Sequence, residues 1–243
     1  MELQLKIALI LLFTGFLHSC SDVESSTHRA LVVVDISGSD VEGIPSEEKV
    51  KNDLFKLFEF DESTTFNDGY EIGITLLDDL SGASIAWSKI KAAEGSSAMV
   101  NPKKRKRITE KFFESLDGNI QRKLSEKELG TGQSKIYAKI CKSLKNFLAK
   151  DADNYYLILY SDLLENSELA SFYKEEEINK AAADPMGFYN EKMKPLCELP
   201  DMSQVLVHIY PYRTPGSDVF INKAEQFWVS LFSEHGAEVV VDP

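Results

Sequence analysis

The sequence predicts an α/β fold in which helices cover both faces of a doubly wound, mainly parallel sheet with one antiparallel edge strand. Three strand-length segments are continuous apolar runs, which is typical of strands buried on both faces: 31–34, 155–160 and 205–210. Segments of helical period separate these runs, as in βαβ units. Two alternating segments joined by a short turn predict a hairpin, and hence one antiparallel strand. The length of 243 residues and the 43% hydrophobic content suit one domain, 30–243.

In the first half of this domain, the buried strand 31–34 precedes a helix and the hairpin. Ser46 is a typical helix N-cap, and the apolar residues that follow have helical spacing: Val50, Leu54, Phe55, Leu57 and Phe58. The hairpin combines the alternating segments 71–77 and 83–89, with Ser81 and Gly82 at the turn.

The second half is expected to contain more helices and three further strands. Expected helices span 108–116, 135–148 and 218–235, and expected strands span 155–160, 205–210 and 238–241. The polar, partly helical segment 163–200 is interpreted as an insertion within the domain.

The charge balance is acidic, with one basic exception. There are 39 Asp and Glu against 27 Lys and Arg, which gives a net charge of −12. Such a surface repels phosphate backbones, so we expect no nucleic-acid partner. The stretch NPKKRKR at 101–107 resembles a nuclear localisation signal. Because a secretion signal precedes it, we interpret it instead as the solvated basic start of a helix.

The N-terminus is expected to direct the chain out of the cytoplasm. Residues 1–19 are interpreted as a signal peptide, because the apolar run at 5–17 is too short to span a bilayer comfortably. Ser19 before Cys20 resembles the lipobox of bacterial lipoproteins, in which the cysteine is acylated. Residues 20–29 then form a tether. This predicts a membrane-anchored protein of the bacterial cell envelope, on its periplasmic or surface side. The alternative is an ordinary secretory signal.

Cys141 and Cys197 remain once Cys20 is assigned to the anchor. In an oxidising compartment they could form a disulfide. Nothing in their spacing requires a pair, so we favour two separate buried cysteines.

Oxygen-bearing side chains gather where two buried strands end. Asp35, Ser37 and Ser39 alternate directly after the first strand, and Asp162 follows the strand 155–160. The carboxyl ends of parallel strands share one edge of a sheet, where binding sites form. Carboxylate and hydroxyl oxygens suit hard divalent cations such as Mg²⁺, and neutral hydroxyls leave the bound cation positive.

These residues resemble the metal-ion-dependent adhesion site of a von Willebrand factor type A (vWA) domain, which has a Rossmann-like fold. Asp35, Ser37 and Ser39 match its D-x-S-x-S motif, and Asp162 matches the aspartate after the fourth strand. Ser134 stands where the family has a threonine, with Thr131 as the alternative. The resemblance spans residues 29–241. It implies bound Mg²⁺, Mn²⁺ or Ca²⁺, and a protein partner whose Asp or Glu completes the metal shell.

Other functions are less well supported by the residues. A haloacid-dehalogenase-like phosphatase needs a second acid two residues after the first, and Ser37 occupies that place. No His and Cys cluster has zinc spacing. We therefore expect a binding protein and no enzyme. Two alternatives stay open: a structural or assembly lipoprotein that no longer uses the metal, and a metal-dependent hydrolase.

Overall fold

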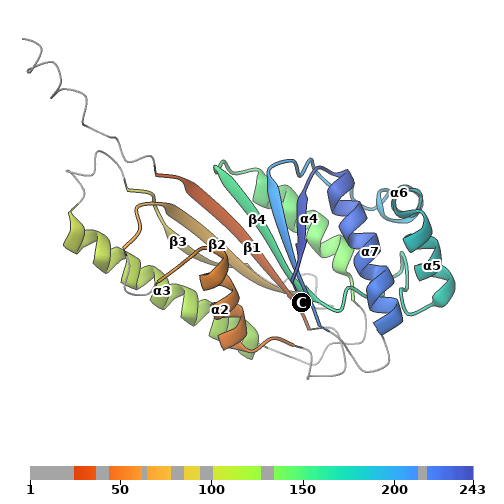
Figure 1. Ribbon diagram of the computed structural model, residues 1–243, viewed down its shortest axis with the longest axis horizontal. Helices are drawn as coiled ribbons and strands as arrows, with labels where there is room; N and C mark the ends of the chain where they lie inside the picture. Colours follow the sequence, from red (N-terminus) through yellow and green to blue (C-terminus); the bar gives the residue numbers. More distant parts are fainter. Residues whose placement is uncertain are drawn as a thin grey trace, which may run out of the picture.

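The computed structural model describes residues 25–36, 44–61, 65–77, 85–93, 101–126, 134–212 and 218–242, which form an α/β domain (Figure 1). Their strands make one six-stranded sheet in the order β3-β2-β1-β4-β5-β6. The strands are β1 (Thr27–Asp35), β2 (Gly69–Leu77), β3 (Ala86–Ile90), β4 (Asn154–Ser161), β5 (Val205–Pro211) and β6 (Glu238–Val241). Only β3, at one edge, is antiparallel to its neighbour. The predicted fold class and the predicted hairpin are confirmed.

Helices pack on both faces of this sheet. On one face lie α2 (Glu47–Leu57) and α3 (Pro102–Ser125); on the other lie α4 (Ile136–Leu148), α5 (Glu175–Ala183), α6 (Pro185–Phe188), the π-helical turn η2 (Tyr189–Met193) and α7 (Asp218–Glu234). Strand β1 is buried from both sides. Leu31 and Val33 join the core under α4 and α7, whereas Val32 and Val34 join the core under α2 and α3. This two-sided burial is why the strand is a continuous apolar run.

The order of the strands changes direction next to β1. The chain moves from β1 to β2 on one side and returns to β4 on the other side, and both strands pair with β1 in parallel. Val34 is in register with Tyr160, so Asp35 and Ser161 end adjacent strands at the same edge. In α/β sheets such a switch point leaves a crevice beyond the carboxyl ends of the strands.

Helix α3 is longer than predicted. It was expected over 108–116, but it begins at Pro102 and ends at Ser125. The Asn101 side chain accepts a hydrogen bond from Lys104 N at 3.1 Å, and proline at the first helical position suits a helix start. The basic run therefore forms the first turns of the helix, as interpreted from the sequence.

The segment 163–200 forms the connection between β4 and β5. Although it is polar in sequence, several of its side chains are buried in the core under α4 and α7: Phe172, Ile178, Phe188, Tyr189 and Met193. Its description as an insertion relative to the vWA family stays a prediction.

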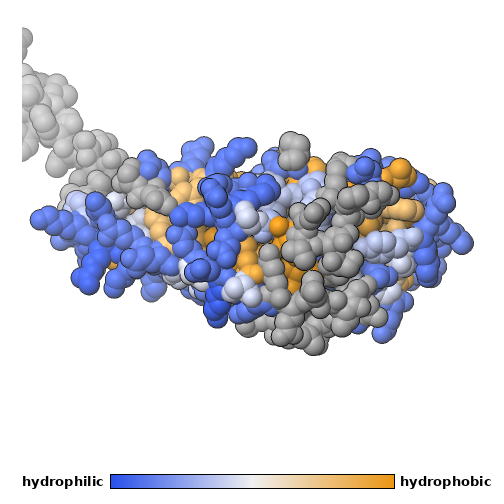
Figure 2. Space-filling model, turned by 90° about the horizontal axis from the view of Figure 1, so that it is seen from below, coloured by the Kyte–Doolittle hydropathy of each residue, from blue (hydrophilic) through white to orange (hydrophobic). Residues whose placement is uncertain are grey.

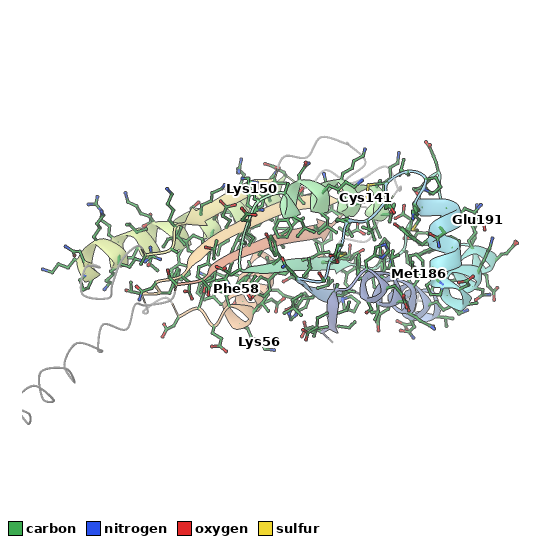
Figure 3. The ribbon with its side chains drawn as sticks, turned by 90° about the horizontal axis from the view of Figure 1, so that it is seen from above. Lys56, Phe58, Cys141, Lys150, Met186 and Glu191 are labelled. Carbon is green, nitrogen blue, oxygen red and sulfur yellow. A yellow bond between two sulfur atoms is a disulfide. The ribbon has the colours of Figure 1, made fainter. Side chains whose placement is uncertain are left out.

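A disulfide joins Cys141 to Cys197, so the interpretation as two separate cysteines is wrong. Cys141 lies on α4, which packs beside the β4–β5 connection (Figure 3). This packing brings two residues 56 positions apart to a Cα–Cα distance of 6.3 Å, which a disulfide can bridge. The contact is tertiary, and the spacing of the cysteines in the sequence contains no trace of it.

The predicted signal peptide, Cys20 and residues 20–24 of the tether lie outside the described residues. None of the helices described has both the length and the apolar content needed to cross a membrane.

Candidate metal centre

Asp35 is at the centre of a buried polar cluster at the carboxyl edge of the sheet. It is the last residue of β1 and is fully buried. Its Oδ2 accepts hydrogen bonds from Ser161 Oγ at 2.7 Å and from Ser134 Oγ at 3.2 Å. Its backbone oxygen accepts a hydrogen bond from the Tyr212 hydroxyl at 2.6 Å. Three separate segments thus fix this aspartate in place.

Ser134 is positioned by a bridge to the loop that follows β4. Its N–H donates to Asn166 O at 2.9 Å, and Asn166 N donates to Ser134 O at 2.8 Å. Helix α4 begins two residues later. The bridge holds the Ser134 hydroxyl toward Asp35, although the two residues are 99 positions apart in the sequence.

Asp162 is held in a tight turn directly after β4. Its Oδ1 accepts from Leu164 N at 3.0 Å, and its Oδ2 accepts from the Tyr173 hydroxyl at 3.3 Å. Leu163 has a φ of 65°, a left-handed conformation that is rare for a leucine. Its N–H donates to Ser161 Oγ and its carbonyl accepts from Trp228 Nε1, at 2.9 and 3.0 Å. Such strained turns persist where the surroundings fix them, and they cluster at functional sites.

The two carboxylates influence each other electrostatically. Burial, and after it the charge of Asp35, raise the pKa of Asp162 to about 7, against the hydrogen bonds from Leu164 and Tyr173, which lower it. Ionised Asp162 is thus disfavoured here, because it loses water and lies close to a like charge. A cation bound by both carboxylates would relieve both effects.

The chemistry of these side chains fits a divalent cation. Asp35 and Asp162 supply carboxylate oxygens and Ser134 supplies a hydroxyl, and Mg²⁺, Mn²⁺ and Ca²⁺ all accept such hard ligands. The described part of the chain contains no group of three or more His, Cys, Asp or Glu placed to hold a metal. A site here therefore depends on hydroxyl ligands. The predicted ligands Ser37 and Ser39, and the alternative Thr131, lie outside the described residues.

Four residues around this cluster were missed by the sequence reasoning: Ser161, Glu165, Tyr173 and Tyr212. Ser161 had a signal, because it forms the Ser-Asp pair that ends β4. The two tyrosines had none, since they reach the cluster through loops.

Glu165 had no sequence signal either. It is fully buried, and its Oε2 accepts from Tyr137 N at 2.8 Å in the first turn of α4. A carboxylate at this position complements the positive end of the helix. Burial nevertheless raises the pKa of Glu165 to about 7, against hydrogen bonds from Ser167 and Tyr137 N.

Comparison with known proteins finds no family model and no curated protein that matches the chain. The resemblance to vWA domains consequently rests on the motif residues, and the fold and the geometry at the edge of the sheet are consistent with it.

Proposed function

We propose that this protein is a lipid-anchored binding protein of the bacterial cell envelope, which engages a protein partner through a divalent cation. The cation, Mg²⁺ or else Mn²⁺ or Ca²⁺, is held by Asp35, Ser37, Ser39, Ser134 and Asp162, and Cys20 carries the lipid. The observation that supports this most is the convergence of Asp35, the Ser134 hydroxyl and Asp162 at the switch point between β1 and β4. This convergence is part of the arrangement that the resemblance to a vWA domain implies.

The ligand set favours binding over chemistry. The hydroxyl ligands add no negative charge to that of the two aspartates, so a partner's Asp or Glu can still complete the shell. The three histidines that the structure describes make their contacts elsewhere. His28 stacks on Tyr70, His208 pairs with Asp242 at 3.0 Å, and His235 contacts the Leu231 carbonyl. None of these contacts places an imidazole as a base beside the two aspartates.

Thermal unfolding of the full chain tests the metal site. After treatment with chelator, wild type should unfold at a higher temperature when Mg²⁺ or Mn²⁺ is added. A cation at a hundred times its dissociation constant stabilises the folded state by about 2.7 kcal/mol. That corresponds to roughly 5 to 10 °C for a domain of this size. Asp35→Asn should abolish the increase and Ser134→Ala should reduce it.

A matched control is Asp151→Asn, which removes an exposed carboxylate near the start of β4. It should keep the full response to the cation. If Mg²⁺, Mn²⁺ and Ca²⁺ all leave the unfolding of folded wild type unchanged, the metal proposal fails.

One observation favours a second candidate function, a metal-independent assembly lipoprotein. Asp35 Oδ2 already accepts hydrogen bonds from two hydroxyls, so this carboxylate is satisfied by protein groups alone. Crosslinking of the chain to its partners in the envelope, followed by capture, separates the two functions. Capture that is lost with chelator supports the metal-dependent function, and capture that is indifferent to chelator supports the second.

A further inference from the structure

The start of α3 carries an exposed basic cluster, defined here as Lys103, Lys104, Lys106 and Arg107. None of the four forms an ion pair with another residue in the part of the chain that the structure describes. This concentration of positive charge stands out in a chain with a net charge of −12. The surface at the left-hand end of Figure 2, where α3 begins, is correspondingly hydrophilic.

The basic cluster is poorly placed for the stability of the helix. The first turn of a helix is the positive end of its dipole, where acids are favourable and cations are unfavourable. The first turn of α3 contains no acid. Like charges on neighbouring turns also repel one another. The folded state thus gains nothing from this arrangement, which points to a negatively charged partner outside the domain.

A buried arginine fixes the cluster to the sheet. Arg105 donates hydrogen bonds to three backbone carbonyls: to Phe66 O and Lys91 O at 2.7 Å, and to Asp68 O at 2.8 Å. It turns inward while the four residues of the basic cluster turn outward. The charges are therefore presented from a fixed helix end.

The same point of the sheet receives the predicted tether. Ser26 N donates to Asp68 Oδ1 at 2.8 Å, Gly69 N donates to Ser26 O at 2.8 Å, and Ser25 Oγ donates to Ala93 O at 3.1 Å. Asp68 thus contacts both the entering chain and Arg105. Figure 1 shows β1 beginning at the end of the molecule where α3 also begins. Cys20 and Ser25 are five positions apart, so at most about 18 Å of chain lies between them.

We propose that the basic cluster binds the anionic phospholipid head groups of the membrane in which Cys20 is anchored. Lysine ammonium groups on flexible stems suit phosphate head groups that offer no fixed geometry. Acidic groups that lie more than about 8 Å from the membrane oppose this contact little, because their charges are screened at physiological salt. The proposal extends the lipid anchoring of the proposed function and is independent of the metal.

Vesicle binding of the full chain with Cys20→Ser tests the proposal without acylation. The vesicles consist of phosphatidylcholine alone or of phosphatidylcholine mixed with phosphatidylglycerol. The N-terminal apolar run contributes equally to binding of both kinds of vesicle. The measured quantity is therefore the ratio of the affinity for anionic vesicles to the affinity for neutral ones. Each lysine or arginine near an anionic surface strengthens binding about fivefold. Lys103→Gln, Lys104→Gln, Lys106→Gln and Arg107→Gln together should therefore lower the preference for anionic vesicles by roughly six-hundredfold.

The matched control removes four exposed lysines at the opposite end of the molecule: Lys174→Gln, Lys180→Gln, Lys192→Gln and Lys194→Gln. Glu191 in Figure 3 marks that end. This variant should keep the preference. Equal binding of wild type to both vesicles, or an equal loss in the two variants, would overturn the proposal.

A second measurement needs no variant beyond Cys20→Ser. Acetylation of lysine amines, followed by mass spectrometry, should be slower at Lys103, Lys104 and Lys106 on anionic vesicles than on neutral ones, and unchanged at Lys174 and Lys180. Equal rates at all five would contradict the proposal. Because the Cys20→Ser chain cannot be acylated, an error in the lipid-anchor prediction would not alter these results. That prediction is tested separately, by incorporation of labelled palmitate in cells.

Discussion

Replacing Asp162 with asparagine is expected to stabilise the metal-free protein at alkaline pH. The pKa of Asp162 is about 7 in the folded state, compared with 3.8 for an ordinary aspartate. Between these values the unfolded chain releases a proton that the folded chain keeps. The stability that belongs to the protonated form is therefore complete below about pH 4 and is lost as the pH rises through about 7. Asparagine cannot ionise, so Asp162→Asn avoids this loss.

The magnitude follows from the pKa difference and from burial. The interval from 3.8 to about 7 is roughly three pH units, and each unit corresponds to about 1.4 kcal/mol. Asp162 is only 5% exposed, so solvent screens little of this effect. An amide can still accept from Leu164 N and can donate to the Tyr173 hydroxyl, so the hydrogen bonds remain. We expect Asp162→Asn to gain about 2 to 4 kcal/mol above pH 8.

Urea unfolding in chelator measures this directly. Wild type and Asp162→Asn should have similar free energies of unfolding at about pH 4, and the variant should be the more stable at about pH 8. Saturating Mg²⁺ should then reverse the order, because only wild type keeps both carboxylates. If the variant is the less stable protein at about pH 8 in chelator, the carboxylate is not penalised in the folded state and the argument for a cation is refuted.

Three further predictions concern the surroundings of the site. Cys141→Ala with Cys197→Ala should lower the free energy of unfolding by about 4 kcal/mol, because the disulfide closes a loop of 56 residues. Urea unfolding measures this, and a loss below about 1 kcal/mol would contradict it. Glu165→Gln should raise the melting temperature in chelator above pH 8 and leave it unchanged below pH 4, since burial raises the pKa of Glu165 to about 7. Arg105→Ala should lower stability by about 3 kcal/mol or more, because it removes three hydrogen bonds; unaltered thermal unfolding would show that those bonds contribute little.

The features that sequence could predict depend on neighbouring residues. Burial of β1 on both faces requires an unbroken apolar run, and that run is visible in the sequence at 31–34. Ser46 accepts from Lys49 N at 3.1 Å, as its N-cap position predicts. Asp35 and Asp162 each follow a strand that the sequence predicts to be parallel, which places both at the same edge of the sheet. The parallel pairing of β1 with β4 confirms that placement.

The features that sequence could not predict depend on residues far apart in the chain. Glu165 is the clearest example: its partner, Tyr137 N, belongs to a helix whose position is set by packing on β1 and β4. The Cys141–Cys197 pair has the same origin. Helix α3 was predicted too short for a different reason. Its N-terminal flank is basic and lacks the apolar period, so only the Asn101 cap and Pro102 mark its start, whereas Ile120 and Leu124 continue the buried spacing of Leu116 past the predicted end.

The basic cluster and the candidate metal centre should act independently, because β1 separates them. Nine residues from Thr27 to Asp35 at a strand rise of 3.3 Å span about 26 Å, roughly three Debye lengths at physiological salt. Changes that far apart, with no shared partner, contribute additively to stability. The variant that lacks the four cationic side chains should therefore show the same Mg²⁺-induced increase in melting temperature as wild type. A smaller increase would mean that the charges of α3 influence the metal centre along the sheet. An increase equal to that of wild type supports a domain that binds lipid at one edge of the sheet and its protein partner at the other.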